Sequence, residues 1–196
     1  MDPMFRYFLG FQVAADRAGW LARQLPPVSG DLFAGMKPQL YHLTLCTIAE
    51  TDEPQPFLRA QVAKALDAGL PAASPIPFGR IVSRDGGGAE LVTVGRVGGI
   101  RHAYNAIVAR LAAQGIDPMH RKAGLRPHIT LGYGQTEGFA PVPIAWTWAP
   151  RDLVLIESHV GHRRHRVLQR WTLASPAQAC FDFMADDLPA PLLRAA

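Results

Sequence analysis

The chain has 196 residues, of which 48% are hydrophobic and 18% charged, with a formal net charge of +4 and a pI of about 9.4. A chain of this size buries enough apolar surface to fold without a disulfide or a structural metal. It shows no apolar run long enough to cross a bilayer and no signal peptide, so we expect a soluble, cytoplasmic protein whose mild basicity suits an anionic partner.

Apolar periodicity and turn residues predict a mixed α+β chain. Short apolar runs predict strands at 5–13, 40–48, 76–83, 91–97, 128–133, 153–158 and 167–173. Helical spacing of apolar residues predicts helices at 16–25, 54–68 and 100–114. The stretches 28–39, 84–88, 116–125 and 159–166 read as loops or turns, and we divide the chain into one domain over 1–174 and a tail over 175–196.

Two of the predicted strands carry the same motif, a histidine followed two residues later by a threonine. The first contains His42 and Thr44, and the second contains His128 and Thr130. Side chains alternate between the two faces of a strand, so each histidine shares a face with its threonine while leucine and isoleucine point to the core. The alternative for either motif alone is a hydrogen-bonded histidine with a structural role beside a strand-forming threonine.

The motifs lie at equivalent places in an internal repeat of strand, helix, loop and histidine strand. Phe5 precedes His42 by 37 positions, and Leu91 precedes His128 by the same 37 positions. A repeat of this kind predicts two lobes related by a pseudo-two-fold axis, with the two motifs facing each other across a central cleft. Neither motif is specific alone, but two copies in such a repeat indicate one shared active site.

Two histidines and two threonines suit the metal-free cleavage of a phosphodiester. Imidazole titrates near neutral pH, so one ring can take a proton from water while the other gives a proton to the leaving oxygen. The threonine hydroxyls can donate hydrogen bonds to the phosphate oxygens. A 2′,3′-cyclic phosphate is a suitable substrate because its strained ring lowers the barrier, and no cofactor is needed.

These motifs resemble the 2H phosphoesterase superfamily, and within it the RNA 2′,3′-cyclic phosphodiesterases, also called 2′-5′ RNA ligases. The resemblance covers roughly 5–173 and includes the opening strand, the stretch 126–131 around the second motif and the final strands at 155–158 and 167–171. It implies a bilobal α+β fold with two pseudo-symmetric lobes, antiparallel-rich sheets around a central cleft and helices outside. It also implies a monomeric enzyme that hydrolyses the 2′,3′-cyclic phosphate of an RNA end or a nucleotide to a 2′-phosphate.

By the pattern of that family, His42 is the proton donor, His128 the proton acceptor, and Thr44 and Thr130 bind the phosphate. The sequence departs from the family where Cys46-Thr47-Ile48 follows the first motif, where His165 stands at a position that is often tyrosine, and where the strand at 91–94 lacks a common tryptophan. These departures concern substrate identity more than the class of reaction.

Further candidates for substrate contact lie close to the motifs or near the end of the domain. They are Lys37, Arg121, Lys122, Arg126, Tyr41, Tyr133, Trp146, Trp148 and His165. Solvation is the alternative for the charged residues, and core packing is the alternative for the tryptophans. The histidines of 159–166 could hold zinc only against the neighbouring arginines, so we expect no metal site there.

The sequence also raises expectations for its two cysteines and offers two alternatives to hydrolysis. Cys46 and Cys180 lack metal-type spacing and are expected to be free thiols, and Cys46 is either a small core residue or a thiol nucleophile working with His128. The alternatives to hydrolysis are a non-catalytic module that binds RNA or a nucleotide, and RNA end joining at the same site.

Overall fold

The computed structural model describes residues 4–25, 33–67, 69–84, 87–119, 124–134 and 140–174. Within these residues the chain forms nine strands, three α-helices and one short 3-10 helix. In chain order they are β1 (Phe5–Gln12), α1 (Ala15–Ala22), β2 (Phe33–Gly35), η1 (Pro38–Leu40), β3 (His42–Thr51), α2 (Leu58–Leu66), β4 (Ile76–Ser83), β5 (Ala89–Thr93), α3 (Gly98–Ala113), β6 (His128–Gly134), β7 (Val142–Trp148), β8 (Asp152–His159) and β9 (Arg164–Thr172).

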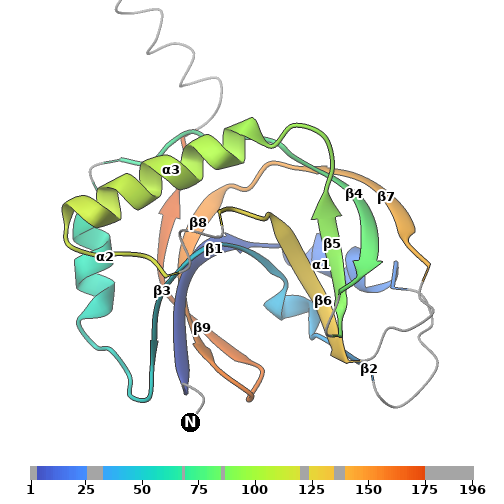
Figure 1. Cartoon of the computed structure of the whole chain (residues 1–196), viewed down its shortest axis with the longest axis horizontal. Helices are drawn as coiled ribbons and strands as arrows, with labels where there is room; N and C mark the ends of the chain where they lie inside the picture. The colour runs from blue at the N-terminus through green and yellow to red at the C-terminus, as the bar shows by residue number, and fades with distance from the viewer. Residues whose placement is uncertain are drawn as a thin grey trace, which may run out of the picture.

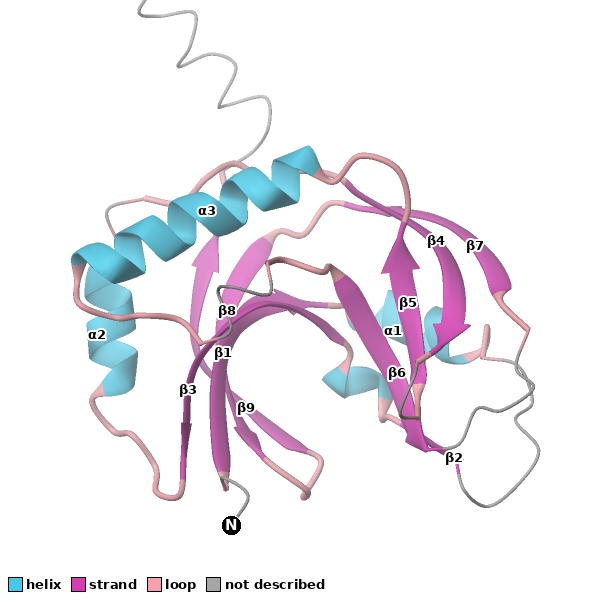
Figure 2. Ribbon diagram, viewed as in Figure 1, coloured by secondary structure: helices cyan, strands magenta, loops and turns pink. Residues whose placement is uncertain are grey.

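The strands form a single curved sheet with the order β7-β4-β5-β6-β3-β1-β8-β9, and β2 adds to β6 (Figure 1). Every strand pair in it is antiparallel. The helices lie on the outside of the curve (Figure 2). The predicted α+β class with antiparallel strands and external helices is therefore confirmed, and the two halves share one sheet that is continuous through β3 and β6.

The core explains why these segments take their observed form. Along β3 and β6 the apolar residues between the motif side chains are buried, with Leu43, Ile129 and Leu131 fully so. They belong to the same core cluster as Ile107 and Leu111 of α3, which form part of that helix's apolar stripe. The predicted helix at 100–114 is thus confirmed with a start two residues earlier, and it supports the back of the histidine strands.

The repeat of strand, helix and histidine strand is present, but the residues that correspond between its two units are not the ones expected. The first unit is β1, α1 and β3, and the second is β5, α3 and β6. Leu91 pairs with Ile129, while Phe11 pairs with Leu43 at the corresponding place in the first unit. Leu91 therefore corresponds to Phe11 and not to Phe5, so the matching 37-residue spacings do not join equivalent positions.

Two strands were absent from the sequence prediction. β7 alternates strictly between the two faces, with Ile144 buried and Trp146 and Trp148 packed partly against the core, yet its prolines and loop-like neighbours obscured it. β2 lies in the stretch that was expected to be a loop. The predicted tail over 175–196 lies outside the described residues, and among the described residues no helix is long and apolar enough to cross a membrane.

Candidate active site

The sheet brings the four motif side chains together at the junction of its two halves. β3 and β6 are antiparallel and Leu43 pairs with Ile129. Stepping one residue along each strand from this pair places His42 opposite Thr130 and Thr44 opposite His128. All four side chains are partly exposed, on the face opposite the buried Leu43 and Ile129. The motifs therefore lie side by side on neighbouring strands of one sheet, and they do not face each other from two separate sheets as expected.

Both imidazoles are held by the same local hydrogen bond. Nδ1 of His42 lies 2.7 Å from the carbonyl oxygen of Leu40, and Nδ1 of His128 lies 2.8 Å from the carbonyl oxygen of Arg126. A carbonyl oxygen only accepts, so each Nδ1 carries a proton and donates it. Nε2 is therefore the ring nitrogen that can exchange a proton, and that of His128 also lies 3.5 Å from Oε1 of Glu90.

Aromatic rings surround His42 and keep it neutral. The ring of Phe8 stacks on His42 with centroids 4.7 Å apart, and His165 approaches edge-on at 5.0 Å. Burial lowers the pKa of His42 from 6.5 to about 4, and the positive charges that His165 and His128 can carry lower it further, against the opposing effect of the Leu40 carbonyl. Burial also lowers the pKa of His165. At neutral pH His42 is therefore able to accept a proton.

A buried carboxylate, which sequence reasoning missed, lies beside His128. Glu90 of β5 is fully buried and pairs in register with Thr130 of the second motif. Nη2 of Arg126 donates to its Oε2 at 2.6 Å, and Nε of Arg84 and Nε2 of His128 both lie 3.5 Å from its Oε1. The signal in the sequence was a lone acidic residue inside the apolar run 89–92.

The remaining predicted contacts divide into two groups. His165 is in ring contact with His42, and Arg126 is tied to the surroundings of His128 through Glu90, so both lie next to the motifs. Lys37 is exposed and immediately precedes η1, and Tyr133 is half-exposed where β6 pairs with β2. Substrate contact by any of these four residues stays a prediction, and Arg121 and Lys122 lie outside the described residues.

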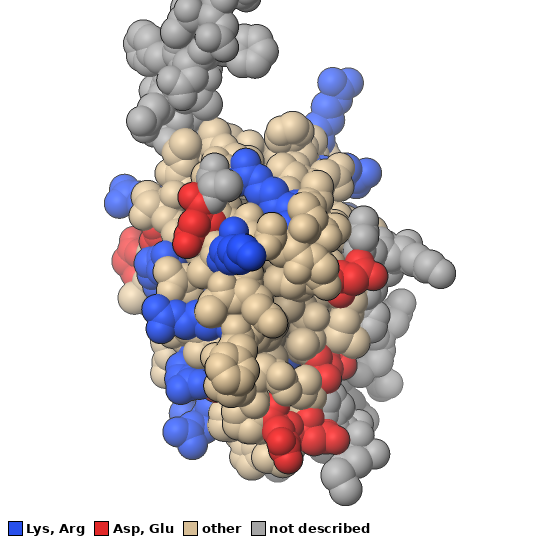
Figure 3. Space-filling view, turned by 90° about the vertical axis from the view of Figure 1, so that its left-hand side faces the viewer, with Lys and Arg blue, Asp and Glu red and all other residues tan. Residues whose placement is uncertain are grey.

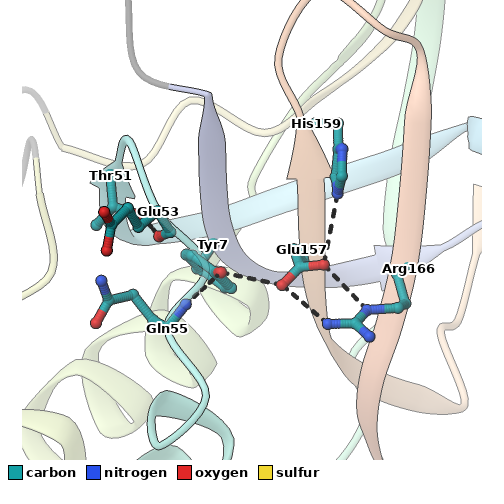
Figure 4. Close-up of polar contacts among 7 residues, drawn as sticks. All are labelled: Tyr7, Thr51, Glu53, Gln55, Glu157, His159 and Arg166. Carbon is teal, nitrogen blue, oxygen red and sulfur yellow. Dashed lines mark hydrogen bonds and ion pairs between the residues drawn. The ribbon is translucent and has the colours of Figure 1, made fainter.

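The strands β8 and β9 form a tight hairpin in place of the expected loop over 159–166. Near its turn Glu157 is buried, with Arg166 at 3.0 Å and His159 at 3.7 Å, and the hydroxyl of Tyr7 donates to it at 3.0 Å (Figure 4). A pocket of about 530 Å³ opens here and reaches His165. Among the described residues no cluster of three histidine, cysteine or acidic side chains could hold a metal ion.

Cys46 and the surface charges add little to this site. Burial raises the pKa of the Cys46 thiol to about 12, so it stays neutral and suits the core role better than that of a nucleophile. On the side of the molecule that carries α2, Lys and Arg lie along one edge and across the upper part of the face, and Asp and Glu lie mainly toward the opposite edge with some among the basic side chains (Figure 3). The positive net charge is not gathered into one patch on that side.

Comparison with known proteins identifies the fold. No protein-family model and no curated protein matches the sequence. Among solved structures, E. coli LigT in complex with 3′-AMP is 20% identical with a TM-score of 0.66, and the match covers 89% of this chain and all of LigT. A protein described as a phosphoesterase is 21% identical with a TM-score of 0.65 and the same coverage. TT0787 of Thermus thermophilus is 17% identical with a TM-score of 0.66, over 87% of this chain and 99% of its own. The chain therefore has the fold of LigT and the phosphoesterase, which is the 2H phosphoesterase fold that its paired motifs indicated.

Proposed function

We propose that the protein is a metal-independent 2H phosphoesterase that hydrolyses 2′,3′-cyclic phosphodiesters at RNA ends or on nucleotides, giving a 2′-phosphomonoester. The observation that carries this proposal is the meeting of two identical motifs at one junction, where both imidazoles are anchored through Nδ1 to a backbone carbonyl. All four motif side chains come from one chain, so the proposed reaction needs no residue from a second copy.

The reaction follows from the arrangement of these groups. One imidazole takes a proton from a water molecule while the oxygen of that water bonds to phosphorus. The bond from phosphorus to one ring oxygen breaks, and the other imidazole gives a proton to that oxygen. The hydroxyls of Thr44 and Thr130 lie diagonally between the histidines and can donate to the non-bridging phosphate oxygens, where negative charge accumulates. Each proton transfer contributes roughly 10²–10⁴-fold to the rate, which is sufficient reason for both histidines to be present.

The comparison structures support the choice of ligand. E. coli LigT, which has the same fold, has been solved with phosphate and with 3′-AMP. We infer that the junction of β3 and β6 in this protein takes the phosphate of a nucleotide or of an RNA end. A purely binding role would need neither two proton-transfer groups nor their matched anchoring.

The test is turnover of a panel of 2′,3′-cyclic nucleotides and RNA with a cyclic phosphate end, in the presence of EDTA, with the product phosphate located by ³¹P NMR. We expect a 2′-phosphate, and we expect His42→Asn and His128→Asn each to lower kcat/KM by roughly 10²–10⁴-fold. His102→Asn is the matched control, because His102 is exposed on α3 outside the sheet. Full activity of the double variant at His42 and His128 would refute the proposal, and ligand binding without turnover by the wild type would favour the binding module.

A further inference from the structure

An arginine lies on the face of the sheet that carries the second motif, two strands away from it. Val92 of β5 pairs with His128 of β6, and Arg80 of β4 pairs with Val92, so the three residues form one line across neighbouring strands (Figure 1). Residues that pair directly across antiparallel strands point to the same face of the sheet. Neighbouring strands are about 4.8 Å apart, so the Cα atom of Arg80 lies about 10 Å from that of His128. The exposed side chain of Arg80 is therefore on the same surface as the motif.

Two more arginines reach this surface through one buried carboxylate. Nη2 of Arg126 donates to Oε2 of Glu90 at 2.6 Å, and Nε of Arg84 lies 3.5 Å from its Oε1. Glu90 is fully buried, whereas both arginine side chains are at least half exposed. A guanidinium group has five N–H donors, so each arginine keeps donors for a further anion while Glu90 holds it in place.

We call Arg126, Arg84 and Arg80 the arginine row, and its charges are unbalanced. Glu90 is the one carboxylate paired with the row among the described residues, and within the same residues Arg80 has no ion pair. Three positive charges against one negative charge leave an excess of two. An excess of this kind beside a phosphate site favours the binding of further anionic groups.

The other half of the sheet is different. There Arg170 of β9 forms an ion pair with Asp152 at 3.0 Å, and Arg6 of β1 forms one with Glu50. Each of these arginines has a carboxylate of its own, and both carboxylates are partly exposed. An anionic ligand that extends beyond the motifs therefore finds more uncompensated positive charge over β6, β5 and β4 than next to β1 and β9.

We propose that the arginine row binds the phosphodiester backbone of an RNA strand whose 2′,3′-cyclic phosphate lies at the junction of β3 and β6. The strand runs from the motifs across β6, β5 and β4, and the preferred substrate is an RNA end and not a free cyclic nucleotide. This inference rests on the proposed phosphodiesterase function and adds a binding surface to it.

The number of charges selects a strand over a single nucleotide. A 2′,3′-cyclic mononucleotide has one negatively charged phosphate, which the motifs bind, and it leaves the arginine row without a partner. An RNA strand brings a further negative charge with each nucleotide. Arginine binds phosphate oxygens through paired N–H groups, and the two guanidinium groups already fixed by Glu90 lose little freedom on binding. Such contacts position a strand without reading its sequence, so we expect little dependence on base identity.

The experiment compares three substrates in the presence of EDTA: a 2′,3′-cyclic mononucleotide, the same nucleotide with a 5′-phosphate, and an RNA of about eight nucleotides with a cyclic phosphate end. We expect wild-type kcat/KM to rise along this series. The affinity for the RNA product is measured by fluorescence anisotropy at several salt concentrations. Each phosphate contact contributes roughly −0.7 to the slope of log affinity against log salt for a single strand.

Arg80→Gln is the main variant, because Arg80 is exposed and its replacement leaves no buried charge unpaired. We expect it to lower the ratio of kcat/KM for RNA to kcat/KM for the mononucleotide by roughly 10-fold, and to make the salt slope shallower by roughly 0.7. Arg84→Gln should act in the same direction, since Glu90 keeps Arg126 as a partner. Arg170→Gln is the matched control, and we expect it to leave both quantities unchanged.

An unchanged ratio and slope in both Arg80→Gln and Arg84→Gln would overturn the inference, and so would a wild type that hydrolyses the mononucleotide as well as the RNA. A loss confined to Arg170→Gln would overturn it too, because the strand would then cross the other half of the sheet. A 5′-phosphate that gives the whole gain by itself would show that the row takes one phosphate and not a strand. If the wild type hydrolyses none of the substrates but binds RNA with a slope that depends on Arg80, the proposed function is refuted and the binding surface stands.

Discussion

Gly10 offers a sharp test of how closely β1 supports the first motif. A Cβ atom at this position would lie 2.4 Å from the carbonyl oxygen of Leu43 and 3.3 Å from Cα of Thr44. Both contacts are with backbone atoms of β3, between His42 and Thr44, so no side chain can rotate away. To restore an ordinary contact of about 3.4 Å, β1 and β3 must separate by roughly 1 Å.

The change Gly10→Ala therefore has two expected results. Overpacking of this kind destabilises a protein by about 1–3 kcal/mol, which lowers Tm by roughly 2–12 °C for a chain of this size. A displacement of about 1 Å in the motif lowers kcat/KM by up to roughly 100-fold, because proton transfer depends on the placement of the ring. Calorimetry and turnover of a 2′,3′-cyclic nucleotide measure the two effects.

Gly19→Ala is the control. Gly19 lies in α1, and a Cβ atom there would meet only Nη1 of Arg23 at 3.7 Å, which is an ordinary contact distance. Alanine also favours a helix over glycine, so we expect Gly19→Ala to raise Tm slightly and to leave turnover unchanged. A Gly10→Ala protein with the Tm and turnover of the wild type would refute the close approach of the two strands that this reasoning requires.

Three further predictions concern buried groups. The pKa of His42 is about 4 in the folded protein and near 6.5 when the chain is unfolded, so the unfolded state binds a proton first as the pH falls. The free energy of unfolding should therefore fall by up to about 3 kcal/mol between pH 6.5 and 4. His42→Asn should lose this part of the pH dependence in urea titrations. Tyr7→Phe removes the donor to Glu157 and the acceptor for the amide of Gln55, and it should lower the free energy of unfolding by about 1–3 kcal/mol without altering the NMR titration of His42. Cys46→Ala should retain turnover, and a loss comparable to that of a motif histidine would restore the thiol as a candidate nucleophile.

The sequence was sufficient for the features that depend on local pattern. The alternation of polar and apolar residues at 42–45 and 128–131 predicted which side chains share a face, and the apolar spacing at 100–111 predicted the helix α3. The fold itself was expected from the family resemblance that the paired motifs carry. Such patterns are visible because each is set by neighbours within a few positions along the chain.

The features that depend on register could not be predicted in this way. Glu90 meets His128 only because β5 pairs with β6 at Thr130, and Phe8 meets His42 only through the bulged pairing of β1 with β3. A one-residue slip would send either side chain to the other face. The surroundings of the two histidines therefore differ although their motifs are identical.

The single pairing of Leu43 with Ile129 also has a thermodynamic consequence. It is the one residue pair recorded between β3 and β6 in the described part of the chain, so the halves of the sheet have little backbone bonding at the place where the motifs meet. A phosphate that accepts hydrogen bonds from both threonines would link the two strands through its oxygens. Ligand binding and the cohesion of the sheet are then linked, and each would strengthen the other by the same free energy.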